Sequence, residues 1–188
     1  MQRAIIALAA TLLAACYPLL IFFGLQLAEP RLIGLVLALL FLCRALLSPR
    51  RVLKKFNPLI VVILPGLICA LLSALINSTL LLRVTPAVIN YTSLALFLGS
   101  LWRPPNMIER FARITEPALD DRGIAYTRWA TVAWSVFFFI NGSIALYTAL
   151  YASMATWTLY NGLLAYLAMG LMFVGEFSVR QYVRRQAA

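Results

Sequence analysis

The residues best suited to bind a ligand are a few polar side chains set within long apolar stretches of the sequence. Polar groups are costly inside a bilayer, so each is either a functional group or a hydrogen-bonding contact between helices. Asn141 and Asn161 lie on either side of an expected turn at residues 150–154, and both fall about 10–15 Å from it at a rise of about 1.5 Å per residue. They could therefore hydrogen-bond to each other and join the last two helices.

A polar pocket is the alternative for this side of the protein. Arg83 directly precedes an expected helix and Asn90 lies one turn into it. A planar guanidinium suits a phosphate or carboxylate headgroup, although such an arginine can equally extend to the membrane surface without binding anything. The residues expected to line the pocket are Arg83, Asn90, Asn141, Tyr147, Tyr160 and Asn161, with Tyr151 beside them.

The carboxylates offer little catalytic chemistry. Glu176 precedes Arg180 by four residues, a helical spacing that predicts a neutralising ion pair. Asp120 and Asp121 suggest a metal site only weakly, because Mg²⁺-dependent chemistry needs several converging carboxylates and the sequence has no second acidic cluster. We expect no metal and no cofactor.

Nucleophilic catalysis is also disfavoured. The chain contains no histidine, which removes the usual general base of Ser-His and Cys-His sites. Cys16, Cys43 and Cys69 all lie in apolar runs without metal-ligand spacing, which argues against disulfides and a zinc site. No catalytic residue is predicted, and an integral-membrane lipid-modifying enzyme ranks last among the expected functions.

The composition explains where these residues must lie. Of 188 residues, 63% are hydrophobic and 12% are charged, and the mean hydropathy is +0.91, which is too apolar for a water-soluble fold. The net charge of +10 does not indicate nucleic-acid binding, because the basic residues cluster at the ends of apolar runs instead of on one face. The sequence therefore predicts an all-α integral membrane protein.

Six apolar segments form one expected domain, residues 1–188. A helix of about 20 apolar residues spans the hydrocarbon layer. Pro30, Pro58 and Pro86 lie in or just before first turns, where a missing N–H is harmless, while Pro65 predicts a kink. The expected spans are 4–27, 32–47, 58–76, 86–102, 129–150 and 155–178.

The N-terminus allows a second interpretation. Residues 13–16 (LAAC) resemble the cleavage box of a lipoprotein signal. The apolar run nevertheless continues beyond Cys16, where a processed lipoprotein would begin a polar tether. We therefore expect an uncleaved first helix.

Loop charges predict the orientation. Thirteen basic residues fall on one side of the expected bundle against two, Arg31 and Arg83, on the other. We expect a bacterial inner-membrane protein, and the positive-inside rule then places both of its termini on the cytoplasmic side. The loop residues expected to contact anionic lipid are Arg50, Arg51, Lys54, Lys55, Arg110 and Arg113.

The long cytoplasmic loop contains a helix signal at residues 106–116. Asn106 and Glu109 form a capping-box pattern. Apolar residues follow on one helical face and charged residues, Glu109 among them, on the other, so we expect a short amphipathic helix on the membrane surface. The apolar residues are Met107, Ile108, Phe111 and Ile114.

Several segments resemble known membrane proteins. Residues 83–90 (RVTPAVIN), then Arg110, then residues 134–142 (WSVFFFING) resemble the bacterial intracellular septation protein A family in order and spacing, over roughly the last four helices. The final hairpin, with residues 157–162 (WTLYNG) and 175–177 (GEF), departs from that pattern. It more closely resembles an uncharacterised group of inner-membrane proteins encoded beside fatty-acid-synthase-like and aryl polyene genes.

These resemblances imply two functions and assign no catalytic residue. The first implies a non-enzymatic protein that supports cell-envelope biogenesis or membrane homeostasis through contacts with lipids and other envelope membrane proteins. The second implies a small carrier or accessory protein for a lipid, acyl or aryl polyene product. A polar pocket open to the outer leaflet would favour the carrier, and a closed bundle would favour the interaction protein.

Overall fold

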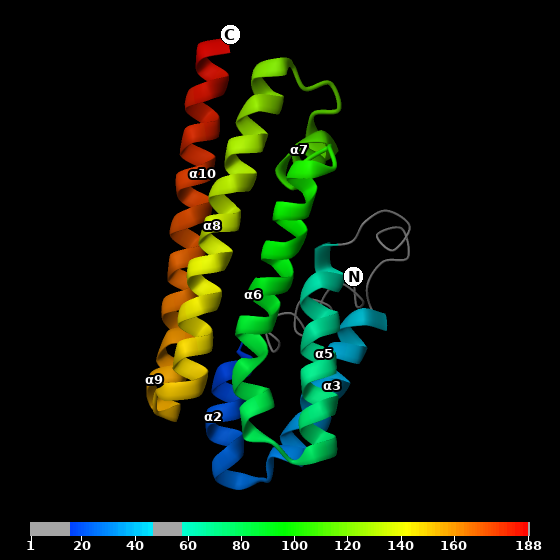
Figure 1. The fold of residues 1–188 in the computed structure, drawn as a ribbon, viewed down its shortest axis with the longest axis vertical. Coiled ribbons are helices and arrows are strands. Elements are labelled where there is room, and N and C mark those ends of the chain that lie inside the picture. Colours follow the sequence, from blue (N-terminus) through cyan, green and yellow to red (C-terminus); the bar gives the residue numbers. More distant parts are fainter. Residues whose placement is uncertain (1–15, 47–57, 188) are drawn as a thin grey trace, which may run out of the picture.

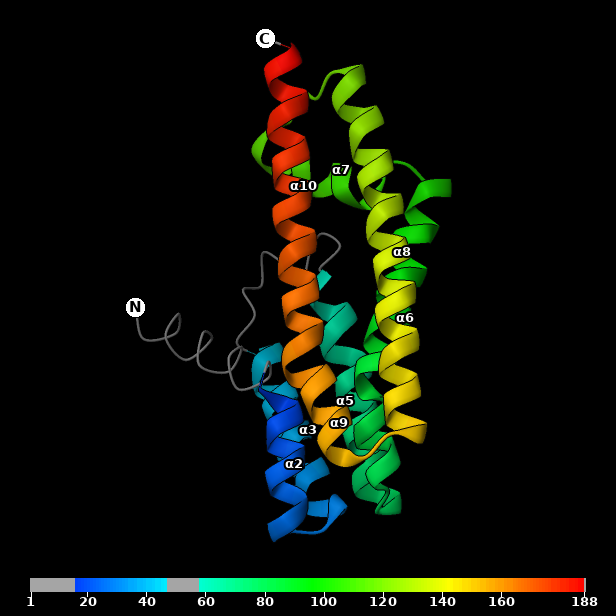
Figure 2. The same cartoon turned by 90° about the vertical axis from the view of Figure 1, so that its left-hand side faces the viewer.

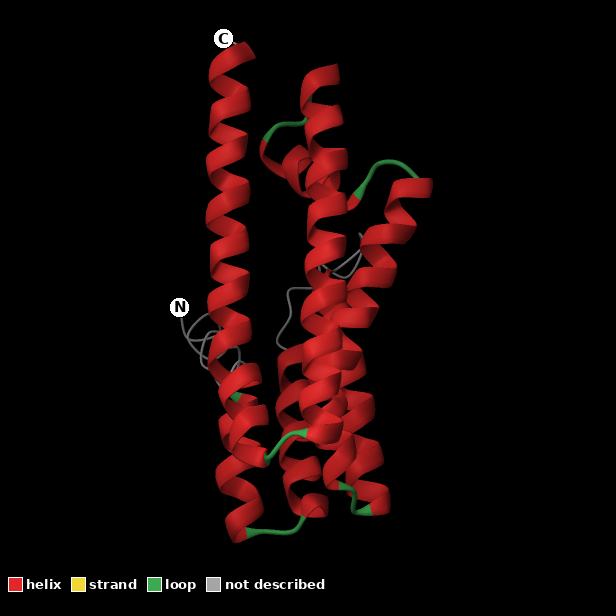
Figure 3. Cartoon of the chain, turned by 60° about the vertical axis from the view of Figure 1, so that its left-hand side comes forward, coloured by secondary structure: helices red, strands yellow, loops and turns green. Residues whose placement is uncertain are grey.

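The computed structural model describes residues 16–46 and 58–187, and this part of the chain is helical with no strand (Figures 1 and 3). The elements are α2 (Tyr17–Leu27), α3 (Pro30–Leu46), α5 (Pro58–Ile76), α6 (Thr79–Trp102), α7 (Met107–Thr115), α8 (Asp121–Tyr151), α9 (Met154–Leu159), a π-helical turn η1 (Tyr160–Leu164) and α10 (Ala165–Ala187).

The long helices run side by side and alternate in direction. The turns after α2, α5 and α8 fall toward one end of the bundle, and α7 and the C-terminus lie at the other (Figure 1). α6 is central, because it packs along α5 on one side and α8 on the other. α10 packs on α8 over a much shorter stretch, and α7 runs across the long helices near their upper ends (Figure 2).

Among the described residues, three helical segments are long and apolar enough to cross a membrane. They are Thr79–Trp102, Asp121–Tyr151 and Met154–Val183, and the last of these runs through α9, η1 and most of α10. Shorter apolar helices cover Tyr17–Leu27, Pro30–Cys43 and Ile63–Ile76. Many large apolar side chains on these helices face outward, as expected for a surface that contacts lipid. The prediction of an all-helical fold is confirmed for the described residues, and their long apolar helices are compatible with a membrane protein.

The boundaries of the N-terminal half agree well with the predicted spans. α5 covers residues 58–76 as expected, and α3 begins at Pro30, two residues before the predicted start. Pro65 lies inside α5. The first predicted span is described only from residue 16, and α2 begins at Tyr17, so residues 13–15 of the lipoprotein-like box lie outside the described part.

The predicted start of the fourth span at Pro86 is wrong. α6 begins at Thr79, so Pro86 lies in its interior. Proline at position 86 supplies no N–H for the Leu82 carbonyl one turn earlier, a loss that membrane helices tolerate. Beside it, Thr85 Oγ1 donates to the Leu81 carbonyl at 2.9 Å. The apolar residues between Thr79 and Pro86 then extend the helix by about two turns.

The last two spans are longer than predicted. α8 begins at Asp121 and not at residue 129, because Asp120 caps it: the Asp120 Oδ1 accepts from the Gly123 N–H at 2.9 Å. The final span is helical from Met154 to Ala187, against the predicted 155–178, and Ser153 caps its start. Asp120 and Ser153 are N-cap residues in the sequence that indicate where these two helices begin.

Close helix packing depends on small residues. A Cβ added to Gly34 would lie 2.7 Å from the Ala70 carbonyl oxygen, so α3 and α5 touch backbone to backbone there. Gly66 accommodates the ring of Phe41 in the same way. Such small-residue contacts are typical of helix pairs in membranes.

Candidate functional site

The main candidate site is a partly open cavity of about 570 Å³ lined by α6, α7, α8 and α10. This volume is within the range of small-molecule binding sites. Aromatic and aliphatic side chains form most of its walls, and polar residues lie at its two ends. The apolar wall residues include Phe97, Phe111, Trp134, Phe138, Met169 and Phe173.

Aromatic rings hold α6, α8 and α10 together along this cavity. The Trp134 ring lies 4.6 Å from the Phe173 ring of α10 at an interplanar angle of 61°, and 5.7 Å from Phe138. Phe138 in turn meets Phe97 of α6 edge-on at 5.0 Å. Edge-to-face packing of this kind is favourable and leaves an apolar surface suited to a hydrocarbon chain.

The cavity's end nearest the C-terminus is polar. Tyr126 Oη donates to the Glu176 carboxylate at 3.0 Å and lies 2.9 Å from the Glu176 main-chain carbonyl. Arg180 lines the same end. The predicted Glu176–Arg180 ion pair is not formed between these two described residues, because the Glu176 side chain turns toward α8 instead. This polar end, with Tyr126, Glu176 and Arg180, is the mouth of the cavity. It therefore holds a carboxylate and a guanidinium that form no ion pair with each other.

α7 forms the adjacent wall, and it is anchored by a buried polar network. Asn106 makes the predicted capping box with Glu109, and the Asn106 side chain also donates to Thr127 at 3.1 Å and accepts from Thr131 at 2.7 Å. Ser100 Oγ accepts from the Met107 N–H at 2.9 Å. α7 is thus fixed to both α6 and α8.

The predicted polar face of this helix is wrong for Glu109. Its side chain is buried, with 5% of its surface exposed, whereas Ile114 of the predicted apolar face is 77% exposed. Burial is tolerated because the Glu109 carboxylate accepts from Asn106 and pairs with Arg113 at 2.7 Å. The capping interaction therefore holds the Glu109 side chain toward the interior, although Glu109 lies on the face that the helical pattern predicts to be exposed.

A chain of hydrogen bonds lies at the cavity's deep end. Asn141 Nδ2 donates to Asn90 Oδ1 at 3.0 Å, and Tyr160 Oη donates to Asn141 Oδ1 at 2.8 Å. Asn90 also lines the cavity. α6 and α8 approach closely here because position 142 is glycine, where a Cβ would lie 3.0 Å from the Asn90 Cβ. The three residues join α6, α8 and η1.

The predicted direct contact between Asn141 and Asn161 is not formed. Asn161 Nδ2 donates instead to Thr148 Oγ1 at 3.2 Å and to the Trp157 carbonyl at 2.9 Å. The π-helical turn at Tyr160–Leu164 adds a residue to the helical repeat, which changes the faces on which residues before and after it lie. Residue spacing on a regular α-helix therefore does not predict the partners of Asn161.

The Arg83 side chain binds backbone carbonyls instead of extending to the membrane surface, and it does not line the main cavity. Its Nη2 donates to the Thr148 carbonyl at 2.9 Å and to the Ala152 carbonyl at 2.7 Å, at the C-terminal end of α8. Trp157 Nε1 donates back to the Arg83 carbonyl at 2.9 Å. A cation is favourable at a helix C-terminus, so Arg83 ties α6 to the turn between α8 and α9.

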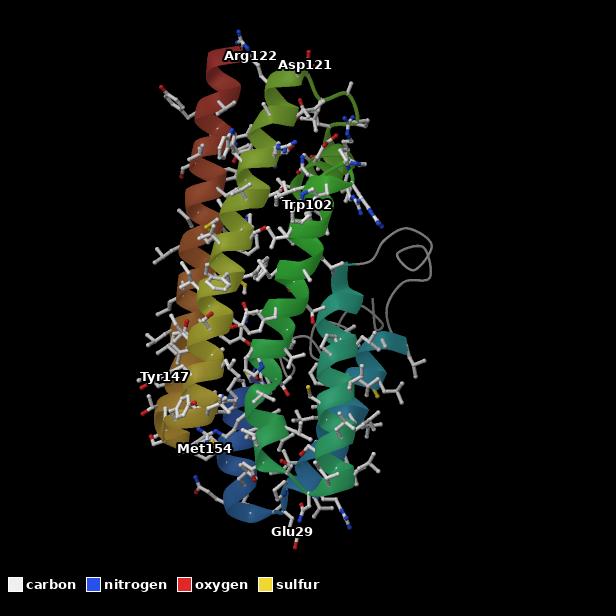
Figure 4. The ribbon with its side chains drawn as sticks, viewed as in Figure 1. Glu29, Trp102, Asp121, Arg122, Tyr147 and Met154 are labelled. Carbon is white, nitrogen blue, oxygen red and sulfur yellow. The ribbon has the colours of Figure 1, made fainter. Side chains whose placement is uncertain are left out.

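Tyr147 does not belong with the other predicted pocket residues. It is 62% exposed and projects from α8, where its ring lies 5.5 Å from that of Tyr151 (Figure 4). The remaining five predicted residues make contacts between helices. Of the predicted set, Asn90 is the residue that also reaches the main cavity.

The other predicted sites divide between described and undescribed residues. The predicted lipid contacts Arg50, Arg51, Lys54 and Lys55 lie outside the described part. Arg110 donates to the Pro105 carbonyl at 2.8 Å and lines a second hollow of about 450 Å³ beside Trp102 and Arg103. Within the described residues, no three His, Cys, Asp or Glu side chains gather to hold a metal, and Asp120 serves as a helix cap.

Sequence reasoning paired Glu176 with Arg180 but did not assign them, or the other cavity residues of α8 and α10, to a pocket. Met169, Phe173, Glu176 and Arg180 follow one another at intervals of four, three and four, which places them on one helical face. Tyr126 was missed because the predicted fifth span began three residues later. The helical spacing was a usable signal, but an apolar helix surrounded by lipid shows no contrast between its faces.

Comparisons of the chain with protein-family models, with curated proteins and with solved structures return no match.

Proposed function

We propose that the chain is a multi-pass protein of a bacterial inner membrane that binds one lipid-like molecule in the cavity between α6, α7, α8 and α10. The observation that carries this proposal is the cavity's polarity: aromatic and aliphatic walls along its length, and Tyr126, Glu176 and Arg180 at one end. An apolar chain fits the walls and a polar headgroup fits the end.

The proposed topology has six spans with both termini in the cytoplasm. It is supported by the arrangement of charges in the bundle. Arg31 and Arg83 lie toward the end that holds the short turns, and the opposite end, near α7, carries Arg103, Arg110, Arg113, Arg122, Arg128 and Arg180. Such an imbalance favours retention of the α7 end in the cytoplasm.

The location of the cavity favours binding or carrying a lipid over action through partner proteins alone. A bundle that served only as a contact surface would not need a cavity of about 570 Å³ beside its central helix. Under the proposed topology the cavity belongs to the inner-leaflet half of the membrane, not the outer leaflet. We propose that this binding serves envelope upkeep or the handling of an acyl or polyene product.

The test is retention of lipid by the purified protein, measured by native mass spectrometry. Met169→Trp places an indole in the cavity, and we expect it to remove the lipid that the unmodified protein retains. Leu171→Trp is the matched control, because Leu171 lies two residues away on α10, is 73% exposed and does not line the cavity. Equal lipid retention by both variants would contradict binding in this cavity.

A further inference from the structure

The mouth of the cavity has a feature that a simple apolar ligand would not require. Glu176 and Arg180 are four residues apart on α10, a spacing at which opposite charges usually meet. Here both line the same cavity, yet Glu176 bonds to Tyr126 and makes no ion pair with Arg180. The negative Glu176 and the positive Arg180 therefore line the same cavity without forming an ion pair.

The packing of α10 keeps this end accessible. α10 meets α8 over a short stretch around Trp134 and Phe173. In the most apolar 18-residue stretch of Met154–Val183, no residue is buried. Glu176 and Arg180 are both partly exposed. A ligand can therefore reach the two charges without unfolding a helix–helix contact.

The depth of the mouth matches a headgroup position. Tyr126 precedes the end of α8 at Tyr151 by 25 residues, which is about 37 Å at a rise of 1.5 Å per residue. Glu176 and Arg180 follow Met154 by 22 and 26 residues, or about 33 and 39 Å. The proposed topology places the turn between α8 and α9 at the opposite surface of the hydrocarbon layer. Because that layer is about 30 Å thick, the topology places all three side chains in the adjoining headgroup layer.

We infer that the cavity selects a phospholipid whose headgroup carries both an ammonium and a phosphate, with the ammonium at Glu176 and the phosphate at Arg180. This inference rests on the proposed lipid binding and specifies its ligand. Glu176 accepts N–H donors, and Tyr126 holds its carboxylate toward α8. The Arg180 guanidinium donates to phosphate oxygens. A purely anionic headgroup would place its phosphate at Arg180 in the same way, but it would supply no cationic donor for the Glu176 carboxylate.

The experiment is a competition between lipids of identical acyl chains, read by native mass spectrometry of the detergent-solubilised protein. The probes are phosphatidylethanolamine, phosphatidylglycerol and phosphatidylcholine. We expect phosphatidylethanolamine to be preferred over phosphatidylglycerol by about tenfold or more, since hydrogen bonds to charged groups are worth that much. Phosphatidylcholine should bind less well than phosphatidylethanolamine, because its trimethylated nitrogen cannot donate to Glu176.

Two variants make the charges separable. Glu176→Gln should weaken phosphatidylethanolamine binding and raise the relative binding of phosphatidylglycerol, which reverses or abolishes the preference. Arg180→Gln should weaken both phospholipids by about tenfold. Arg122→Gln is the control: it removes the same charge from an exposed position at the start of α8, outside the cavity (Figure 4), and should change nothing.

The outcomes separate this inference from the proposed function. Equal binding of phosphatidylethanolamine and phosphatidylglycerol by the unmodified protein would overturn the headgroup assignment while leaving lipid binding intact. The absence of any retained lipid would overturn the proposed function itself. The competition needs only the unmodified chain, so it decides the question even if a variant fails to fold.

Discussion

Removal of the Arg83 side chain should destabilise the bundle by about 2–4 kcal/mol. Arg83→Ala deletes two hydrogen bonds to the carbonyls of Thr148 and Ala152. It also deletes a cation from the C-terminus of α8. Polar contacts in membrane bundles contribute about 0.6–1.7 kcal/mol each, and a charge at a helix end adds about 0.3–1 kcal/mol.

Lysine at position 83 should recover part of this loss. Both bonds come from one terminal nitrogen, Nη2, and an ammonium has enough donors to replace it. The lysine side chain is one bond shorter, so we expect Arg83→Lys to lose about half as much free energy as Arg83→Ala.

The measurement is reversible unfolding of the purified protein in mixed micelles, with Arg122→Ala as the control. Arg122 is an exposed arginine at the other end of the molecule (Figure 4), and its loss should change the free energy of unfolding by less than about 0.5 kcal/mol. If Arg83→Ala unfolds like the unmodified protein, the hydrogen bonds from Arg83 to the end of α8 do not stabilise the bundle.

Three further predictions concern the scaffold. Gly34→Ala should cost about 1–3 kcal/mol of unfolding free energy, because the added methyl meets the Ala70 backbone, whereas Gly170→Ala, with open space around it, should not destabilise the protein. Asn106→Ala should cost about 1–2 kcal/mol and raise amide hydrogen exchange in α7, since the cap and its bonds to α8 are lost; unchanged exchange would contradict the anchoring of α7. Reporter fusions at Gln186 and within residues 103–128 should both report the cytoplasm, and a periplasmic signal from either would refute the proposed topology.

The cavity could be anticipated from sequence only in part. The face shared by Met169, Phe173, Glu176 and Arg180 is readable from helical spacing. Which helix covers that face is not readable, because all the long helices are apolar on every side. The partner of Glu176 illustrates the limit: sequence spacing predicted Arg180, and the position of α8 supplied Tyr126 instead.

The sequence by itself determined the helical, membrane-compatible character of the chain. Apolar runs of about 20 residues between charged loops are typical of helices in lipid, because a helix hydrogen-bonds its backbone groups within its own segment. Local chemistry also determined the capping box of α7, since Asn106 and Glu109 interact within one turn.

Only the tertiary structure decided which polar groups meet. Asn141 bonds to Asn90 across α6 and α8, and Asn161 bonds to Thr148, because the π-helical turn and Gly142 set the register and the approach of the helices. Arg83 found its carbonyl partners at the end of α8 for the same reason. Residues far apart in the sequence meet according to helix packing, and packing among uniformly apolar helices depends on side-chain shape, which the pattern of polar and apolar residues does not record.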